Sequence, residues 1–376
     1  MERRLEMDWD TAYRRYNHNL FRQLVYIHRH LHQSMLNTLI ASGYDQFRMN
    51  FIDVIPYLAP EGVRLADLVE LHQLPKASLA RLINTVHEQG FIDKIPDPED
   101  SRANTLFITE KGVELIQKAF THTQAIERNL CQLMGQEAFQ QFCQAVEKTF
   151  QALNLSYPPT SHYFKDATTD KLFSGRLQIQ LTAITKYVDL RVLDSNQAAG
   201  FDDLQAPHRT VLGQISQQGT RATEIAKKEG ISKQSISDIS HVLLVKKYLK
   251  RIKDSEDKRA HRLIFAERGQ QMITHTMEEL LSLEKELETQ IGTKSFSQLC
   301  EQSERLWFLL DGQNPDLIFD EEISTIDPLL KTTMDQFLKA IQQNHASLQG
   351  KIFQKEADHY VLRAEFLKYL ETFNIS

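Results

Sequence analysis

Residues 231–265 read ISKQSISDISHVLLVKKYLKRIKDSEDKRAHRLIF, and this stretch decides the fold of the chain. Ser232 is placed to cap a helix, because a serine hydroxyl accepts a hydrogen bond from one of the first free N–H groups of a helix. Ile236, Ile239 and Leu243 recur at helical spacing and are expected to face inward. The opposite side is polar and carries Lys233, Gln234, Ser235, Ser237, Asp238 and His241.

A charged loop follows this helix. Residues 254–259 read DSEDKR, and the apolar alternation at Leu263 and Phe265 after them predicts the second strand of a hairpin. A short polar helix that enters the major groove, followed by a hairpin that reaches the neighbouring phosphate backbone, is the arrangement of a winged helix. The stretch therefore predicts a winged helix-turn-helix that binds double-stranded DNA.

Composition limits the class of protein. The chain has 376 residues, of which 41% are hydrophobic, so two folded domains are expected. Three cysteines, the absence of a basic-then-apolar leader and the lack of a long apolar run predict a reduced, cytoplasmic protein without a membrane partner. The sequence contains no P-loop, dinucleotide fingerprint, nucleophile elbow or zinc-protease motif. We therefore expect no enzyme, no catalytic residue, no bound metal and no cofactor.

Basic charge is concentrated around the predicted hairpin. The whole chain has a formal net charge of −6. Residues 220–262, however, contain twelve Lys and Arg against six Asp and Glu, a balance of +6. A basic patch on an acidic protein is the footprint expected of a local contact with phosphate groups.

The chain repeats itself at an offset of 157 residues. This offset places Arg64 on Arg221 and Lys76 on Lys233 without a gap, and it places residues 97–103 on residues 254–260. Apolar positions of the flanking helices also match: Leu20, Leu24, Ile27 and Leu31 correspond to Leu177, Leu181, Ile184 and Val188. Each repeat is therefore expected to be a complete domain of about 140 residues.

The expected fold class is mainly α with small β-wings, in four parts. They are a first winged-helix domain (1–153), a linker with a Pro-Pro pair (154–170), a second winged-helix domain (171–310) and a helical extension (311–376). In the first domain we expect helices over 20–40, 47–58, 65–71 and 76–88, a hairpin over 91–107, and long helices from 111 to 153 with a break near Gly135. In the extension we expect helices over 328–348 and 355–373.

This pattern resembles the MarR family of bacterial transcription regulators. The resemblance rests on a wing written D-x-x-D-x-R, followed by an apolar strand and a Lys-Gly or Arg-Gly step. The wing stands here as residues 97–102 (DPEDSR) with residues 109–112 (TEKG), and again as residues 254–259 (DSEDKR) with residues 266–269 (AERG). The second copy departs from the family pattern at Ala266, where the family usually has Thr.

The resemblance implies an intramolecular pseudo-dimer, because MarR-type proteins work as homodimers and this chain resembles two such subunits fused in tandem. The two winged helices would read consecutive major grooves about 34 Å apart. The wing-tip residues Arg102 and Arg259 would enter the minor groove, which attracts arginine where it is narrow. Asp100 and Asp257 would brace the wings through ion pairs. The other candidate DNA contacts are Ser232, Lys233, Gln234, Ser235, Ser237, His241, Arg251, Lys253, Lys258 and Arg262 in the second repeat, and Lys76, Ser78, Arg81 and Asn84 in the first.

The family also implies a small aromatic effector, bound between the long helices and the winged helices. An aromatic stretch near the N-terminus is one candidate lining for such a pocket, and packing in the core is the other interpretation. The residues of this stretch are Trp9, Tyr13, Tyr16, Phe21 and Tyr26.

The two repeats differ in charge, which leaves several readings open. Residues 63–105 contain five basic and seven acidic residues, a balance of −2. Because each neutralised phosphate adds to the affinity and to its salt dependence, the second repeat is expected to supply most of the affinity for an asymmetric operator. A plasmid-type replication initiator and a winged-helix interaction module that binds no DNA are the alternative functions. Further oligomerisation through the last helices also stays open.

Overall fold

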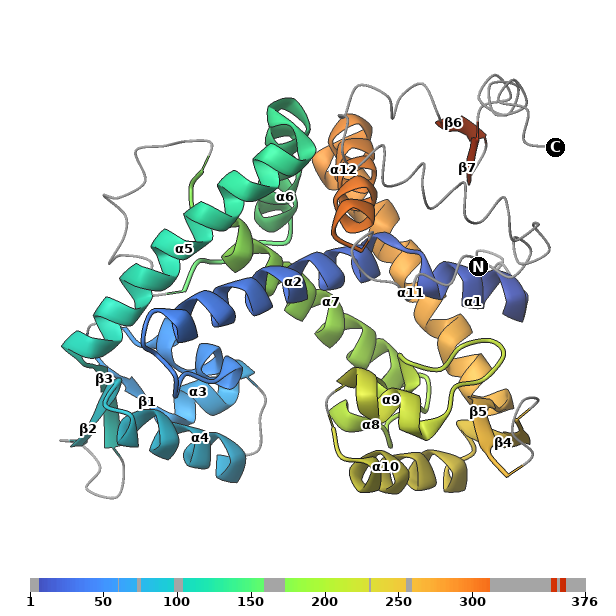
Figure 1. Ribbon diagram of the computed structural model, residues 1–376, viewed down its shortest axis with the longest axis horizontal. Coiled ribbons are helices and arrows are strands. Elements are labelled where there is room, and N and C mark those ends of the chain that lie inside the picture. The colour runs from blue at the N-terminus through green and yellow to red at the C-terminus, as the bar shows by residue number, and fades with distance from the viewer. Residues whose placement is uncertain are drawn as a thin grey trace.

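The computed structural model describes residues 7–59, 61–72, 76–97, 104–158, 173–229, 231–254, 259–311, 353–356 and 359–362. Over these residues the chain is mostly helical, with three small antiparallel sheets. Figure 1 shows long helices crossing in the upper part of the molecule and two compact lobes at its lower edge, one from each half of the chain. Among the described helices, none has the length and apolar character that would let it cross a membrane.

The first half alternates long helices with one small lobe. Two helices open it, α1 (Trp9–Asn17) and α2 (Leu20–Ala41), capped by the side chains of Asp8 and Asn19. The lobe contains η1 (Met49–Asp53), η2 (Ile55–Tyr57), β1 (Val63–Arg64), α3 (Leu65–His72), α4 (Lys76–Glu88), β2 (Ile92–Pro96) and β3 (Asn104–Ile108). Two long helices close it, α5 (Glu110–Met134) and α6 (Gln136–Ala152). Gly135 separates these two helices with a φ of +85°, a conformation that glycine adopts without strain.

From α2 onward the second half follows the first, with helix α8 (Ala206–Leu212) in the place of η1 and η2. Its elements are α7 (Leu177–Ala198), α8, α9 (Ala222–Glu229), α10 (Lys233–Val245), β4 (Leu249–Lys253), β5 (His261–Phe265), α11 (Glu267–Ile291) and α12 (Thr293–Asp311). Most of them begin and end 157 residues after their counterparts, for example α4 and α10, β3 and β5, and α5 and α11. The predicted helix-turn-helix and hairpin segments are therefore present as helices and strands in both halves.

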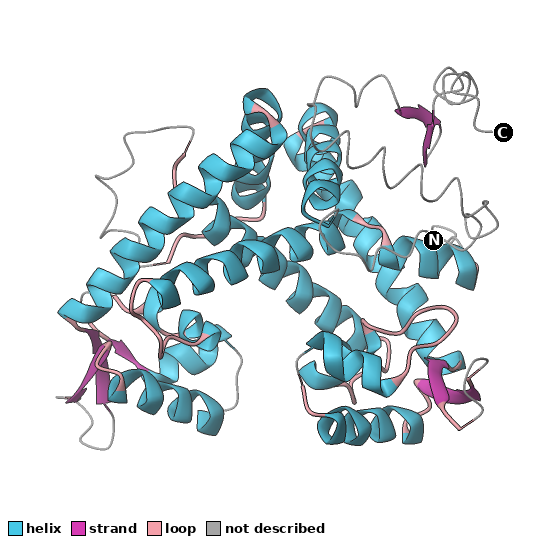
Figure 2. Cartoon of the chain, in the orientation of Figure 1, coloured by secondary structure: helices cyan, strands magenta, loops and turns pink. Residues whose placement is uncertain are grey.

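The strands form antiparallel pairs at the outer side of each lobe (Figure 2). In the first half β3 lies between β1 and β2, with Leu106 opposite Val63 and Lys94. In the second half β4 pairs with β5, and a bridge from Thr220 to Leu263 takes the place of β1. Each hairpin is thus tied to the segment that begins the helix-turn-helix pair.

Two predicted helices are wrong. Residues 47–58 form the short 3₁₀ turns η1 and η2, because Pro56 has no N–H to continue an α-helical ladder. Within the predicted helix 355–373, residues 355–356 and 359–362 belong instead to the antiparallel strands β6 (Phe353–Glu356) and β7 (His359–Leu362). The Tyr360-Val361 pair in β7 has side chains that favour a strand. The helix predicted over 328–348 and most of the linker lie outside the described residues.

One apolar core joins the two halves. It collects residues of α2, α5 and α6 from the first half and of α7, α11 and α12 from the second, among them Leu24, Ile27, Phe139, Phe142, Leu181, Ile184, Leu287 and Leu306. Each lobe has a further core of its own, around Phe51, Leu79, Ile92 and Leu106 in the first and around Val211, Ile236, Leu243 and Leu263 in the second. Burying this much apolar surface between the halves fixes the two lobes relative to each other.

Helix α1 belongs to the first half but packs on the second lobe. The rings of Trp9 and Tyr13 lie 5.6 and 6.2 Å from the ring of Phe265, centroid to centroid. The Tyr13 hydroxyl donates a hydrogen bond of 2.9 Å to the carbonyl of Ile215. The guanidinium of Arg22 in α2 donates to the carbonyl of Gly213 at 3.0 Å. The N-terminal aromatic residues are therefore part of the packing between the halves.

Candidate nucleic-acid interface

Helix α10 presents one polar, exposed face. The Ser232 hydroxyl accepts a hydrogen bond of 3.1 Å from the backbone N–H of Ser235, which confirms the predicted N-cap. Ile236 and Leu243 are fully buried on the inner side, and Ile239 is half-buried, as their spacing predicts. The predicted contact residues are all exposed, namely Ser232, Lys233, Gln234, Ser235, Ser237 and His241.

Two contacts within α10 order this face. The Gln234 amide donates to the Asp238 carboxylate at 2.9 Å, and the hydroxyls of Ser232 and Ser235 lie 2.8 Å apart. Both pairs are exposed, so neither is shielded from a groove that approaches the helix. Lys233 stands beside them as the cation of the first turn.

Helix α4 presents the equivalent face in the first lobe. Lys76, Ser78, Arg81 and Asn84 are exposed there, as predicted. The amide oxygen of Asn84 accepts a hydrogen bond from Lys94 of β2, so its acceptor is already engaged. Figure 1 shows α4 and α10 along the same lower edge of the molecule, with the hairpins at the two outer ends. The two helices therefore lie along one side of the protein.

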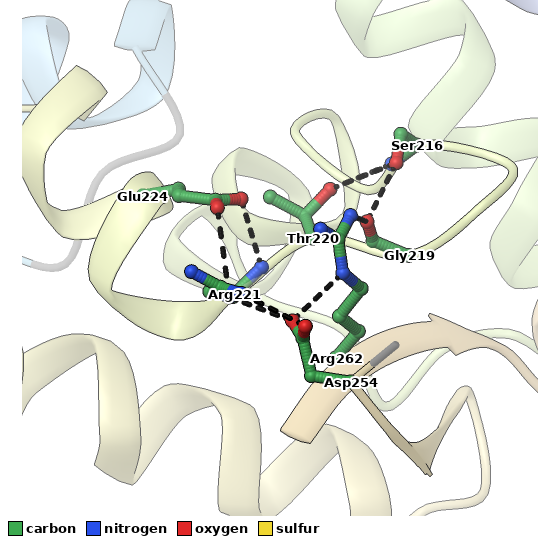
Figure 3. Close-up of polar contacts among 7 residues, drawn as sticks. All are labelled: Ser216, Gly219, Thr220, Arg221, Glu224, Asp254 and Arg262. Atoms are coloured by element: carbon green, nitrogen blue, oxygen red, sulfur yellow. Dashed lines mark hydrogen bonds and ion pairs between the residues drawn. The ribbon is translucent and has the colours of Figure 1, made fainter. Parts of the chain in front are cut away.

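A buried carboxylate holds the base of the second hairpin (Figure 3). Asp254 follows β4 directly, and only 3% of its surface is exposed. Its Oδ2 lies 2.6 Å from Nε of Arg221 and 2.8 Å from Nε of Arg262, while its Oδ1 accepts from Nη2 of Arg221 at 2.8 Å. Arg262 also donates to the carbonyl of Gly219 at 3.2 Å. This network joins the hairpin to the segment that starts α9.

The first lobe has an equivalent network, in which a threonine stands at the position of one of the two arginines. Asp97 accepts from Nε of Arg64 at 2.6 Å and from Nη2 of Arg64 at 3.1 Å. The Thr105 hydroxyl donates to Asp97 at 3.0 Å from the position that Arg262 occupies in the second lobe. Because the carboxylate is buried in both lobes, these contacts offset the cost of removing its charge from water.

These two carboxylates were missed as site residues in the sequence. The predicted bracing residues Asp100 and Asp257, together with Arg102 and Lys258, lie outside the described residues. The sequence does contain a sign of their role: Arg64 and Asp97 both recur 157 residues later, as Arg221 and Asp254. An Arg and an Asp that recur together are expected to form a pair when the hairpin folds back on the helix-turn-helix.

The remaining predicted contacts of the second lobe fall into two groups. Arg251, Lys253 and Arg259 are exposed on or beside the hairpin. Arg262 is half-buried, and its guanidinium is engaged by Asp254 and Gly219. We therefore group Arg262 with the residues that hold the hairpin. Other exposed lysines of this lobe are Lys227, Lys228, Lys247 and Lys250.

An apolar cavity of about 160 Å³ lies between the first lobe and the long helices. Its walls come from α2, the η1–η2 segment, α5 and α7, and they include Phe51, Leu115, Phe120 and Ile179. The five N-terminal aromatic residues had two interpretations, the lining of an effector pocket and packing in the core, and none of them is among the described residues that line this cavity. Tyr13 and Phe21 are instead buried in the core. The structure therefore supports the core-packing interpretation of these residues, since α1 packs on the second lobe and Phe21 of α2 lies in the core that joins the halves.

One wall of the cavity is polar. His32 lies there beside Thr182, whose hydroxyl is 3.4 Å from Nε2 of His32 and 3.0 Å from Nε2 of His28. Burial lowers the pKa of His32 to about 4. Burial and the neighbouring His32 lower the pKa of His28 to about 3. Both imidazoles are thus neutral near pH 7, and His32, which lines the cavity, can exchange a hydrogen bond with a polar group there.

Comparison with known proteins finds solved structures that are similar to part of the chain at low identity. No family model and no curated protein matches the chain. The solved structures similar to it include the transcriptional regulator Tm0710 from Thermotoga maritima, with 18% identity, 34% of this chain and 92% of that chain covered, and a TM-score of 0.29. Another is a mutant of MepR from S. aureus bound to an oligodeoxyribonucleotide, with 17% identity, 35% and 96% coverage, and a TM-score of 0.27.

A third similar structure is the transcriptional repressor CouR bound to a 23-mer DNA duplex, with 20% identity, 35% and 95% coverage, and a TM-score of 0.26. These relatives are MarR-type transcriptional regulators, and each match covers about one third of this chain. Because identity and TM-score are both low, we base the function on the residues of the chain itself.

Proposed function

We propose that the chain is a sequence-specific transcription regulator that binds double-stranded DNA as an intramolecular pseudo-dimer of two winged helices. The observation that carries the proposal is the exposed polar face of α10, held by buried Ile236 and Leu243 and flanked by a hairpin with exposed Arg251 and Lys253. Short polar side chains on such a helix reach base edges, and exposed cations beside it neutralise phosphates.

The same proposal assigns unequal roles to the two lobes. Residues 220–262 have a charge balance of +6, whereas residues 63–105 have a balance of −2. Each neutralised phosphate contributes about one unit to the slope of log K against log salt. The second lobe therefore supplies most of the affinity, and the operator has unequal halves.

A matched pair of variants tests this assignment. Lys233 and Lys76 stand 157 residues apart at the first position of α10 and α4, and both are exposed. Genomic fragments selected by the wild-type protein provide the duplex, and binding is titrated across salt concentrations. Lys233→Ala is expected to weaken binding and to reduce the salt slope by about one unit, whereas Lys76→Ala changes both less.

A second matched pair, Arg259→Ala and Arg102→Ala, extends the test to the wings. Equal losses of DNA affinity in both members of each pair would contradict the unequal roles of the two lobes. The proposal that the chain binds DNA would still stand. Failure of the wild-type chain to select or bind any duplex in a salt-dependent way would remove the regulator assignment itself. It would favour the interaction module that binds no DNA.

The proposal includes a small aromatic effector in the cavity of the first lobe. Its volume of about 160 Å³ is similar to that of an apolar cavity of about 150 Å³ that holds benzene. The polar wall at His32 and Thr182 would accept one hydrogen-bonding group of the ligand. Phenol serves as a probe, and its binding is measured by calorimetry. Ala119→Phe, which fills the cavity, is expected to abolish the heat of binding, and an unchanged heat would place the ligand elsewhere.

A further inference from the structure

A second hollow, which we call the basic cleft, lies on the second lobe at the C-terminal end of α10. It is an open cleft of about 1020 Å³ between the end of α10, the start of β4 and the start of α11. Lys246, Lys247, Lys250 and Arg268 line it, together with Phe201 and Val245. None of these six residues is among the individual DNA contacts assigned above, although Lys246, Lys247 and Lys250 count toward the basic balance of residues 220–262.

Two of the four cations are occupied by an acid of the same lobe. Asp203 lies 3.1 Å from Nη2 of Arg268 and 3.8 Å from Nζ of Lys246. Lys247 and Lys250 are exposed, and Glu267 is the acidic residue in the lining. The basic cleft thus offers two exposed lysines beside two further cations that share the single negative charge of Asp203.

The first lobe lacks this charge. At the offset of 157 residues, the four cations correspond to Gln89, Gly90, Asp93 and Lys111. The basic rim is therefore specific to the second lobe, unlike the networks at Asp97 and Asp254, which both lobes share.

Lys247 keeps its side chain at a conformational cost. Its φ is +62°, in the left-handed region, whereas Gly90 has a φ of +76° at the equivalent turn of the first lobe. A residue with a Cβ atom in this region costs about 1–2 kcal/mol relative to its relaxed conformation. Strain of this kind at an exposed cation points to a use for the side chain.

The cleft also exposes apolar surface. Val245 is 66% exposed, the highest value among the large apolar side chains in the described part of the chain, and it stands at the edge of the cleft. Half-buried Phe201 also lines the cleft, and buried Leu249 lies beneath it. A surface that combines apolar side chains with a cationic rim fits a peptide segment that carries both apolar and acidic residues.

This chain contains such a segment just after α12. Residues 312–327 read GQNPDLIFDEEISTID, with five Asp and Glu, no Lys or Arg, and the apolar run Leu317-Ile318-Phe319. We propose that residues 316–322, DLIFDEE, bind in the basic cleft of the same molecule. The apolar run would cover Val245 and Phe201, and the acids that follow would approach Lys247 and Lys250.

The segment begins at the end of a described helix. Helix α12 follows α11 through Gly292, and the opposite end of α11 forms one wall of the cleft. An extended chain spans about 3.3 Å per residue, so the eight residues from 312 to 319 reach about 26 Å beyond the end of α12. A tethered segment also has an effective concentration of the order of millimolar, so a weak contact suffices to occupy the cleft.

Photocrosslinking in the full-length chain tests the proposal without DNA. Phe319 is replaced by benzoylphenylalanine, the protein is illuminated, and the crosslinked peptides are identified by mass spectrometry. Intramolecular crosslinks to residues 245–250 or 266–271 are expected. The double variant Lys247→Glu/Lys250→Glu is expected to lower their yield at least about fivefold, a change of about 1 kcal/mol in the contact.

Two controls keep the outcome decisive. Lys227→Glu/Lys228→Glu reverses two exposed lysines of α9 outside the cleft and is expected to leave the yield unchanged. Lys247→Gly removes one cation and also removes the backbone strain at this position. A lower crosslink yield in this variant would therefore not be caused by misfolding. Crosslinks that map to other surfaces would overturn the proposal, and so would crosslinked dimers in place of intramolecular products. An equal loss of crosslink yield in both double variants would also overturn it, because the segment would then be attracted by the general charge of the lobe and not by this cleft.

Discussion

The guanidinium of Arg221 lies 2.6 Å from the carboxylate of Asp254, and the same distance separates Arg64 from Asp97, 157 residues earlier. Both carboxylates are buried, and both directly follow the first strand of a hairpin. The pair therefore fixes each hairpin to its helix-turn-helix at the point where the strand ends. The residues around the two pairs differ, and these differences lead to measurable predictions.

Arg262→Thr separates a structural role of Arg262 from a DNA contact. Threonine stands at the equivalent position 105 and donates to Asp97, so the variant keeps a donor near Asp254. We expect DNA affinity and salt slope to stay close to those of the wild type. A phosphate contact by Arg262 would instead reduce the slope by about one unit. Titration across salt concentrations distinguishes the two roles.

Glu127 is expected to stabilise the junction between the halves. Its buried carboxylate accepts hydrogen bonds from the backbone N–H groups of Gly175 (2.8 Å) and Leu177 (3.1 Å), at the start of α7. Glu127→Ala leaves these donors unpaired and is expected to cost about 2 kcal/mol in the free energy of unfolding. Urea unfolding measures this loss.

Glu284 provides the matched control for Glu127, because it stands at the equivalent position of α11. Within the described residues no hydrogen bond to its carboxylate is found, and Asn19 already caps α2 through the N–H of Arg22. Glu284→Ala is therefore expected to cost less than Glu127→Ala. The opposite order would show that the buried cap does not stabilise the junction.

The stability of the protein should also depend on the protonation of Glu284. Burial raises the pKa of Glu284 to about 7, against the smaller opposing effect of Arg15. Between about pH 4.5 and 7 the folded state holds a proton that the unfolded state has lost, so stability falls as pH rises through this window. Glu284→Gln should match the wild type near pH 4 and be more stable at pH 8. Thermal unfolding at both pH values gives the comparison, and an equal difference at both would rule out this linkage.

His28 and His32 should have the opposite effect. Their lowered pKa values, about 3 and about 4, mean that both are neutral in the folded state where unfolded histidine is charged. Stability therefore rises with pH between about 4 and 6.5. The double variant His28→Gln/His32→Gln should flatten this rise. His241→Gln, which changes an exposed residue of α10, serves as the control and should keep the rise.

Lys247→Gly should make the protein more stable. The backbone of Lys247 has a φ of +62°, and glycine adopts this conformation without a Cβ clash. Relief of the strain is expected to add about 1 kcal/mol to the free energy of unfolding. Chemical denaturation measures the gain, and a loss of stability would mean that the lysine side chain contributes more than the strain removes.

Much of the fold follows from local sequence. The helical spacing of Leu20, Leu24 and Ile27, the Ser232 cap and the turn at Gly135 predicted where helices begin and end, and the offset of 157 residues carried those limits into the second half. The exposed face of α10 was predicted for the same reason, since a helix with apolar residues every third or fourth position must expose the others. These features depend on residues a few positions apart, so the sequence determined them by itself.

Contacts between distant residues were decided only by the tertiary structure. The placement of Tyr13 against Ile215, 202 residues away, the cap of α7 by Glu127 and the engagement of Arg262 by Asp254 all require the halves or the hairpin to fold first. For an aromatic or charged residue, the sequence offers many other residues that could pack against it or pair with its charge. Packing selects one of them, because burial makes every unpaired polar group and every unfilled space costly.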